Sequence, residues 1–134
     1  MGLAPEHAVH PFAPVWDVHC RVLVLGSFPS VRSRQIGFYY GHPQNRFWRV
    51  LERLYGQPVP PDTAGRRSFV LRHGLALWDV LAACDIVGSS DASIRHAVPN
   101  DVPALLASGG IKRVFCNGQR AYVLYLRYLD AACG

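Results

Sequence analysis

Residues 21–51, which read RVLVLGSFPSVRSRQIGFYYGHPQNRFWRVL, decide the fold. The stretch begins with an apolar run over residues 21–25, which Gly26 ends. Such a run is typical of a buried strand in a parallel sheet. The next residues, Gly26-Ser27-Phe28-Pro29-Ser30, form a loop because Pro29 interrupts the strand and glycine lets the backbone approach a ligand. Since ligands of open α/β sheets bind at the carboxyl ends of strands, we expect a binding site in this loop.

Helical signals recur after this loop. Helices are expected over residues 46–55, about 63–74, 101–108 and 119–129. Asp62 or Thr63 can cap the second of them, and Asn100 or Asp101 the third. Three apolar runs, at residues 21–25, 75–79 and 113–116, predict strands that alternate with these helices. This alternation predicts an α/β fold with three layers, α/β/α, around a short parallel central sheet.

Other segments are less patterned. Residues 81–85 fit a helix or a strand, and residues 86–99 are rich in small polar residues and predict a loop. Residues 1–20 predict an irregular arm that packs Phe12 and Trp16 on the domain. We expect the three histidines of this arm to meet solvent: His7, His10 and His19.

Composition sets the class of the chain. Its 134 residues predict one domain, residues 1–134, with a substantial core. The sequence contains no apolar run as long as a membrane span and no signal peptide at its start. The four cysteines are scattered without a CxxC pair, which disfavours a zinc site or a disulfide framework and favours reduced thiols in a cytoplasmic protein. A net charge of +5 suits a polyanionic partner.

Several enzyme classes lack their motifs here. The sequence has no GxSxG nucleophile elbow, no GxxxxGK[ST] loop and no GxGxxG loop, and its histidines and cysteines lack the spacing of metal ligands.

The stretch GSFPSVRSRQIGFYYGHPQNRFW resembles the uracil-DNA glycosylase superfamily. The most similar branch is that of the hypoxanthine (deoxyinosine) DNA glycosylases, near the mismatch-specific uracil glycosylases. HPQNRFW is the most specific piece, and HGLALWDVLAACD at 73–85, SDASIRHAVPND at 90–101 and VFCNGQRAY at 114–122 agree with it. The resemblance covers about residues 10–129.

The resemblance implies a monofunctional DNA glycosylase that removes hypoxanthine or uracil in base excision repair. It implies a partner, DNA that contains deaminated bases, and no metal, cofactor or membrane; in complete form we expect a monomer. Two alternatives stay open. The chain could bind DNA without catalysis, as a remnant of this fold, or it could be a nucleotide-binding α/β module.

Asn45 is the candidate catalytic residue. A carboxamide can hold water by its oxygen while its NH2 group contacts sugar or base. The simpler interpretation is that Asn45 only caps the helix that begins at residue 46, since Asn is among the best capping residues. The resemblance favours catalysis, because the deoxyinosine branch uses this Asn, whereas sister branches place an Asn or Asp where this chain has Phe28.

The candidates for binding the base lie in the same stretch and at the second strand. Tyr40 is the expected stacking platform, with Phe38 and Tyr39 as competitors, although an FYY cluster also suits a core. Backbone N–H groups of Gly26, Ser27 and Phe28 would face the base or sugar. At the strand end in LWD, Asp79 could accept from N1–H of hypoxanthine, or it could be a capping or ion-paired residue.

Basic residues near the pocket are the candidates for contacts with DNA phosphates. They are Arg32, Arg34, His42 and Arg46. His42 also fits an ordinary turn before Pro43. Asn117 follows the third strand, where we expect a turn or helix cap.

The resemblance leads us to expect one more strand after the last helix, then a Ser/Pro/Asn-rich loop that helps to expel the base. Nothing after Leu129 matches this pattern. We therefore expect a C-terminally incomplete domain that lacks the last strand of its sheet, with an exposed sheet edge and weakened activity.

Overall fold

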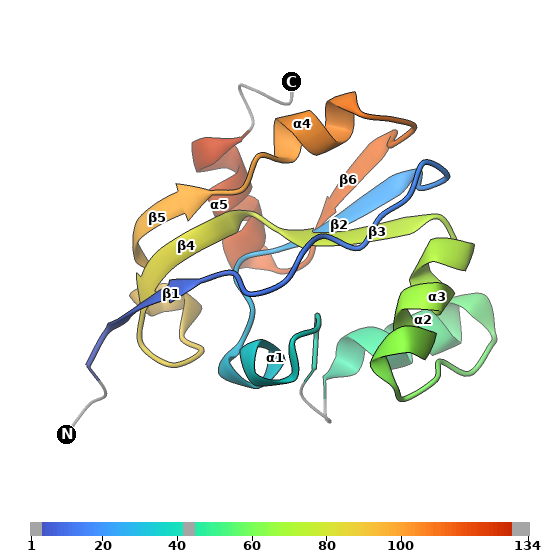
Figure 1. The fold of residues 1–134 in the computed structure, drawn as a ribbon, viewed down its shortest axis with the longest axis horizontal. Helices are drawn as coiled ribbons and strands as arrows, with labels where there is room; N and C mark the ends of the chain where they lie inside the picture. Colours follow the sequence, from blue (N-terminus) through green and yellow to red (C-terminus); the bar gives the residue numbers. More distant parts are fainter. Residues whose placement is uncertain (1–3, 42–44, 130–134) are drawn as a thin grey trace.

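The computed structural model describes residues 4–41 and 45–129, in which two small sheets lie side by side (Figure 1). The strands are β1 (Glu6–Val9), β2 (Val22–Gly26), β3 (Leu75–Asp79), β4 (Leu81–Ile86), β5 (Arg95–Pro99) and β6 (Arg113–Cys116). The helices are α1 (Val31–Ile36), α2 (Arg46–Tyr55), α3 (Thr63–Arg72), α4 (Val102–Ala107) and α5 (Gln119–Tyr128), with a 3₁₀ turn, η1, at Asp91–Ser93. None of these helices has the length and apolarity needed to cross a membrane.

The parallel sheet confirms the predicted α/β architecture. Its strand order is β3-β2-β6, with the apolar run of residues 22–26 in the centre. Successive side chains of a strand point to opposite faces. Accordingly, Leu23 and Leu25 belong to one core cluster with Val102 and Leu124 from α4 and α5. Val24 belongs to a second cluster with residues of α2 and α3. Helices therefore cover both faces of the sheet (Figure 1).

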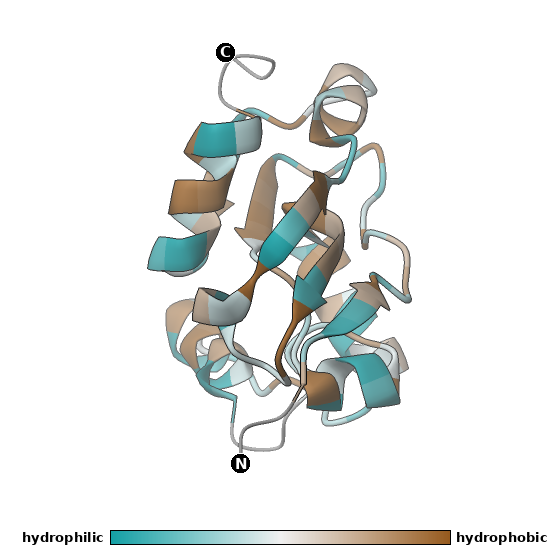
Figure 2. Cartoon of the chain, turned by 90° about the vertical axis from the view of Figure 1, so that its left-hand side faces the viewer, coloured by the Kyte–Doolittle hydropathy of each residue, from teal (hydrophilic) through white to brown (hydrophobic). Residues whose placement is uncertain are grey.

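Most of the predicted helices are confirmed. The side chains of Asn45, Asp62 and Asp101 accept hydrogen bonds at the N-termini of α2, α3 and α4. Helix α5 buries Ala121 and Leu124, while the side of it that Figure 2 shows carries hydrophilic and hydrophobic residues in turn. The short helix α1, which Ser30 caps, was not predicted, because residues 31–36 carry no apolar periodicity.

The second sheet is antiparallel, in the order β1-β4-β5, and it corrects two expectations. Residues 86–99 are not wholly a loop, since β5 occupies 95–99, and the arm is not irregular at residues 6–9, where β1 pairs with β4. Both flanking strands are largely exposed, and Ala8 is the one buried residue of β1. An exposed strand has no apolar alternation, so neither strand carries a local signal in the sequence.

The two sheets join where the strand-end loop begins. Strands β3 and β4 form an almost continuous ribbon that Val80 interrupts (Figure 1). The N–H of Val80 donates to the Gly26 carbonyl at 2.8 Å, and that of Leu81 donates to the Ser27 carbonyl at 3.1 Å. The Asn100 side chain donates to the carbonyls of Asp79 and Leu81 at 2.9 and 3.1 Å. Asn100 was a candidate cap for α4, a role that falls to Asp101.

The rest of the N-terminal arm runs antiparallel alongside β3, from its carboxyl end back toward its start. The N–H of His10 donates to the Ala82 carbonyl, and Val15 forms an antiparallel bridge with Leu77. As predicted, Phe12 and Trp16 pack against the two core clusters. The arm therefore holds His10 close to the end of β3.

Strand β6 pairs with β2 alone among the described residues, and its Phe115 is 61% exposed. An apolar groove of about 590 Å³ lies between this strand and α2. That a further strand pairs with β6 in a longer chain stays a prediction.

Candidate active site

A cavity of about 210 Å³ opens at the carboxyl ends of β2 and β3. Six of the predicted site residues line it together: Gly26, Ser27, Phe28, Tyr40, Asn45 and Asp79. Asp91 and Asn117 line it as well. Cavities for drug-sized ligands measure about 300–1,000 Å³, so this one suits a flat group such as a single base.

The wall formed by Gly26 and Asp79 depends on the missing side chain of the glycine. Gly26 lies opposite Asp79 in the parallel register, and a Cβ atom on Gly26 would overlap the Asp79 carboxylate. The same Cβ would also lie 3.4 Å from the Tyr40 hydroxyl oxygen. Because Gly26 has no side chain, the Asp79 carboxylate and the Tyr40 hydroxyl can both lie close to the end of β2.

Asp79 forms a buried pair with His10, which the sequence reasoning placed in solvent. His10 Nε2 lies 2.7 Å from Asp79 Oδ2, and the two side chains are 4% and 5% exposed. Burial raises the pKa of Asp79, while the hydrogen bond with His10 opposes that rise. The expectation of solvent contact is wrong for His10, but His7 and His19 are exposed.

Aromatic rings surround His10, which explains its burial. Its imidazole lies 4.6 Å from the ring of Phe12, 5.8 Å from Tyr39 and 6.1 Å from Phe28, measured between ring centroids. The apolar residues that flank His10 in AVHPF were the one available signal, and three histidines in a short Pro-containing arm obscured it.

Of the FYY cluster, Tyr40 offers the most open position. Phe38 stacks on Trp48 within the core, and the Tyr39 hydroxyl donates to the Ala13 carbonyl. Tyr40 has a φ of 51°, a left-handed conformation that is uncommon for a bulky residue and occurs preferentially at functional sites. The Trp48 indole N–H fixes this conformation by donating to the Tyr40 carbonyl at 3.0 Å.

The Tyr40 side chain is held on one face and buried at its tip. Its ring stacks on Phe47 at 4.1 Å. The hydroxyl is buried and has no hydrogen-bond partner among residues 4–41 and 45–129. Burial raises the pKa of Tyr40, the charge of Asp79 raises it further, and the neighbouring Asn117 side chain opposes the rise. A buried hydroxyl without a partner in the cavity wall is suited to bind a ligand.

Asn45 both caps a helix and lines the cavity. Its Oδ1 accepts from the Phe47 N–H at 2.8 Å, as the simpler interpretation expects. The cap uses the side-chain oxygen and not the NH2 group, so it does not exclude a second role. Catalysis by Asn45 stays a prediction.

Two further residues join the site, one from the predicted loop over residues 86–99 and one from the predicted turn or helix cap after the third strand. Asp91, in η1, accepts from the Ser27 hydroxyl at 2.8 Å. Asn117 is not the N-cap of α5, because Gly118 takes that position. The signal for both was their place within the quoted pieces SDASIRHAVPND and VFCNGQRAY.

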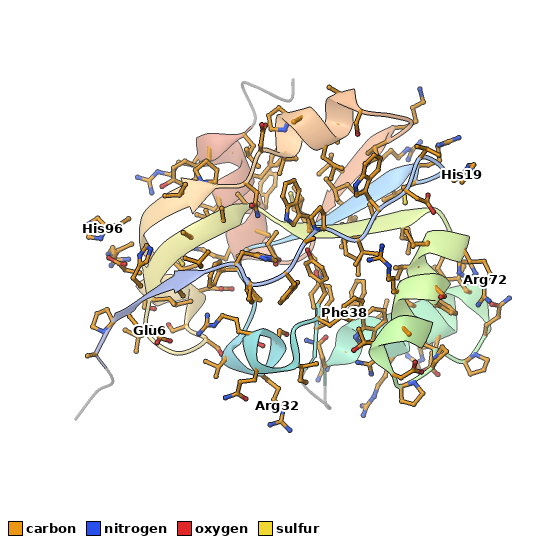
Figure 3. All side chains as sticks on the ribbon, in the orientation of Figure 1. Glu6, His19, Arg32, Phe38, Arg72 and His96 are labelled. Carbon is orange, nitrogen blue, oxygen red and sulfur yellow. The ribbon has the colours of Figure 1, made fainter. Side chains whose placement is uncertain are left out.

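The predicted phosphate contacts fall into different environments. Arg32 and Arg46 are exposed, and Arg32 projects away from the sheets (Figure 3). Arg34 is instead 13% exposed and donates to the carbonyls of Pro29 and Gly88. The position of His42 lies outside the described residues.

Within the described ranges, no three His, Cys, Asp or Glu side chains cluster in a way that could hold a metal ion.

Comparisons with known proteins agree with this geometry. A hypoxanthine DNA glycosylase of Methanosarcina barkeri is 34% identical over an alignment of 115 residues, and the match covers 82% of this chain and 71% of that protein. The chain belongs to the hypoxanthine DNA glycosylase family, within the uracil-DNA glycosylase superfamily. The member from Methanosarcina acetivorans is also 34% identical, with the same coverage of both chains.

A solved structure supports the family assignment. The solution NMR structure of a candidate uracil DNA glycosylase from Methanosarcina acetivorans superimposes with a TM-score of 0.76 and 30% identity, covering 90% of this chain and 75% of that one. No protein-family profile matches the chain.

Proposed function

We propose that this protein is a DNA glycosylase that hydrolyses the N-glycosidic bond of deaminated bases in DNA, hypoxanthine above all and also uracil. The observation that carries the proposal is the convergence of Asn45, Tyr40 and Asp79 on one base-sized cavity at the strand ends. These residues come from three segments of a chain that belongs to the hypoxanthine DNA glycosylase family. Because a base inside a duplex is unreachable, the substrate would be a nucleotide flipped into this cavity.

Each of the three side chains has a role that suits its chemistry. Tyr40 contributes an aromatic surface to the base, and the cavity lies beside it. Asp79 accepts a hydrogen bond from the N–H on the pairing edge of hypoxanthine or uracil. Asn45 positions the water whose oxygen bonds to C1′ of the sugar as the bond from C1′ to the base breaks. The leaving base takes the electron pair of that bond and then gains the proton that the water releases, so that the products are the C1′ hydroxyl and the neutral base.

Donors in the cavity would stabilise this charge as it develops. The Tyr40 hydroxyl and the Asn117 carboxamide both line the cavity and can donate. The hydroxyl is the stronger candidate, because it is buried, forms no hydrogen bond of regular geometry among the described residues and has only the Asn117 side chain close enough to influence it. The Tyr40→Phe variant would remove this donor while it keeps the ring.

The proposal is tested by incubating the protein with duplexes that contain one deoxyinosine, one deoxyuridine or neither, followed by alkaline cleavage at abasic sites. We expect cleavage at deoxyinosine by the wild-type chain and a loss of about 10²-fold or more in Asn45→Ala. Asn45→Ser keeps a capping oxygen, so it separates the two roles of this residue. An inactive Asn45→Ser variant with unchanged melting temperature supports catalysis.

One outcome would count against the role of Asn45, and another against the proposed activity itself. Full activity of Asn45→Ser would leave Asn45 as a helix cap only. Binding of inosine-containing duplex by the wild-type chain without any base release would favour a DNA-binding protein without catalysis.

A further inference from the structure

We propose that His10 is a positioning residue that keeps Asp79 a hydrogen-bond acceptor and thereby limits the site to bases with an N–H on their pairing edge. This inference rests on the proposed function, in which Asp79 contacts the base. His10 itself does not line the cavity. It acts from the N-terminal arm, behind the carboxylate.

The geometry gives the two oxygens of Asp79 different tasks. Oδ2 lies 2.7 Å from His10 Nε2. Oδ1 is the oxygen that a Cβ on Gly26 would overlap, and Gly26 lines the cavity. His10 thus engages the rear oxygen and leaves Oδ1 on the cavity side.

The surroundings of His10 determine where its proton lies. Nδ1 is buried and has no hydrogen-bond partner in the described part of the chain. A proton on Nδ1 would be an unsatisfied buried donor, which is costly. The arrangement that avoids this cost is a neutral imidazole with its hydrogen on Nε2, which donates to Asp79 Oδ2. Asp79 then has no proton of its own and can only accept.

The state of Asp79 decides which bases fit. Hypoxanthine presents N1–H and uracil presents N3–H, so either can donate to a carboxylate. Adenine presents a lone pair at N1 and cytosine a lone pair at N3, so a carboxylate repels both. A protonated Asp79 would reverse this preference, because it would donate.

His10 is the neighbour that favours the anion. Burial, which removes solvent, and the nearby charge of Asp91 on η1 both favour the protonated acid, whereas His10 lowers the pKa of Asp79. The remaining titratable groups that face Asp79 are Tyr39 and Tyr40, whose own pKa values are raised by burial. Both tyrosines are therefore neutral, and the pKa of Asp79 stays raised overall, so the hydrogen bond from His10 is the contact on which its anionic form depends.

The test compares His10→Leu, which removes the donor, with His10→Gln, which retains one, and with His19→Ala as an exposed histidine control. The first readout is the titration of Asp79 in the free protein, followed by the ¹³C chemical shift of its carboxyl carbon. We expect Asp79 in His10→Leu to titrate at higher pH than in the wild type, and His10→Gln and His19→Ala to stay close to the wild type.

The second readout is single-turnover excision from duplexes with hypoxanthine or adenine. For His10→Leu we expect the rate on hypoxanthine to fall about tenfold or more near pH 6 and less near pH 8, with a smaller preference over adenine. His10→Gln should recover most of the rate at both pH values.

The inference is overturned if a folded His10→Leu variant shows an unchanged Asp79 titration and an unchanged pH profile. Should His10→Leu not fold, a folded but inactive His10→Gln variant would equally overturn it, because a neutral donor would not suffice. If the wild type releases no base, the proposed function fails, whereas the titration of Asp79 still decides the role of His10.

Discussion

The parallel and the antiparallel sheet contribute to the site in different ways. The parallel sheet places Gly26 and Asp79 opposite each other at adjacent strand ends, so the groups that face the cavity follow from strand register. The antiparallel sheet supplies support: β1 leads into the arm that carries His10, and the chain between β4 and β5 carries Asp91. The parallel sheet carries the groups that face the cavity, whereas the segments next to the antiparallel sheet carry residues that contact these groups from outside the cavity or influence their charge.

The largest effect is expected at Gly26, where the parallel sheet positions the Asp79 carboxylate. Gly26→Ala places a Cβ against the Asp79 carboxylate, which must then move away from the cavity. We expect excision of hypoxanthine to fall about 10²-fold or more, since a shift of about 1 Å in a positioning group can cost that much. Single-turnover kinetics measure the loss. Gly109→Ala is the control, because its Cβ would meet only Trp16 at 3.9 Å.

Asp79→Asn separates function from stability at the same strand end. Excision of hypoxanthine should drop strongly, while the free energy of unfolding near neutral pH should rise by on the order of 1 kcal/mol, since a buried carboxylate whose partner His10 is a neutral donor is replaced by an uncharged amide. The folded-state pKa of Asp79 is raised, so its contribution to stability is present below the unfolded pKa and is lost as pH rises through the folded pKa.

The stability gain of Asp79→Asn should therefore grow with pH and vanish in acid. Urea unfolding at several pH values measures it. A variant that is less stable than the wild type at every pH would show that the His10–Asp79 pair holds the two sheets together, rather than costing stability.

The junction between the sheets depends on Asn100. Asn100→Ala leaves the carbonyls of Asp79 and Leu81 without the side-chain donor, and we expect a loss of about 1–3 kcal/mol in unfolding free energy. The neighbouring Asp101→Ala removes only the cap of α4, at about 0.5–2 kcal/mol. Excision should weaken in Asn100→Ala alone. Equal effects of both variants on excision would contradict a special role for the junction.

The salt dependence of DNA binding should distinguish the exposed Arg32 and Arg46 from the largely buried Arg34. Arg32→Ala and Arg46→Ala should each reduce the slope of log K against log salt by about 0.9, as expected for one lost phosphate contact on duplex DNA. Arg34→Ala should leave the slope unchanged and lower the melting temperature, because Arg34 bonds to Pro29 and Gly88. Fluorescence anisotropy over a salt series measures the slopes.

The sequence predicted the parallel sheet because its buried strands are continuous runs of apolar residues, such as residues 22–26 and 75–79. It also located the strand-end loop, Tyr40, Asn45 and Asp79 at one cavity. It did not predict β1 and β5, whose exposed residues lack alternation, or the burial of His10, which depends on rings brought from distant segments. Local patterns report what an element buries, whereas pairings across the fold leave no local signal.

The smallest effect is expected on the outer face of the antiparallel sheet. Asp85 on β4 accepts from His96 on β5 at 2.7 Å and from His7 on β1 at 3.0 Å, and these bonds, that of His96 first, lower the pKa of Asp85. A lowered folded-state pKa adds stability above the unfolded value, which is lost as pH falls through the folded one. Asp85→Asn should therefore melt slightly lower than the wild type near pH 7, and the difference should shrink toward pH 3.

Excision by Asp85→Asn should match the wild type, since the His7–Asp85–His96 cluster lies on the surface and none of its members lines the cavity. Melting curves at the two pH values and single-turnover excision on inosine duplexes provide the measurements. If excision falls while melting is unchanged, β1 transmits the state of this cluster along the arm to His10. The antiparallel sheet would then regulate the charge of Asp79, and not merely support it.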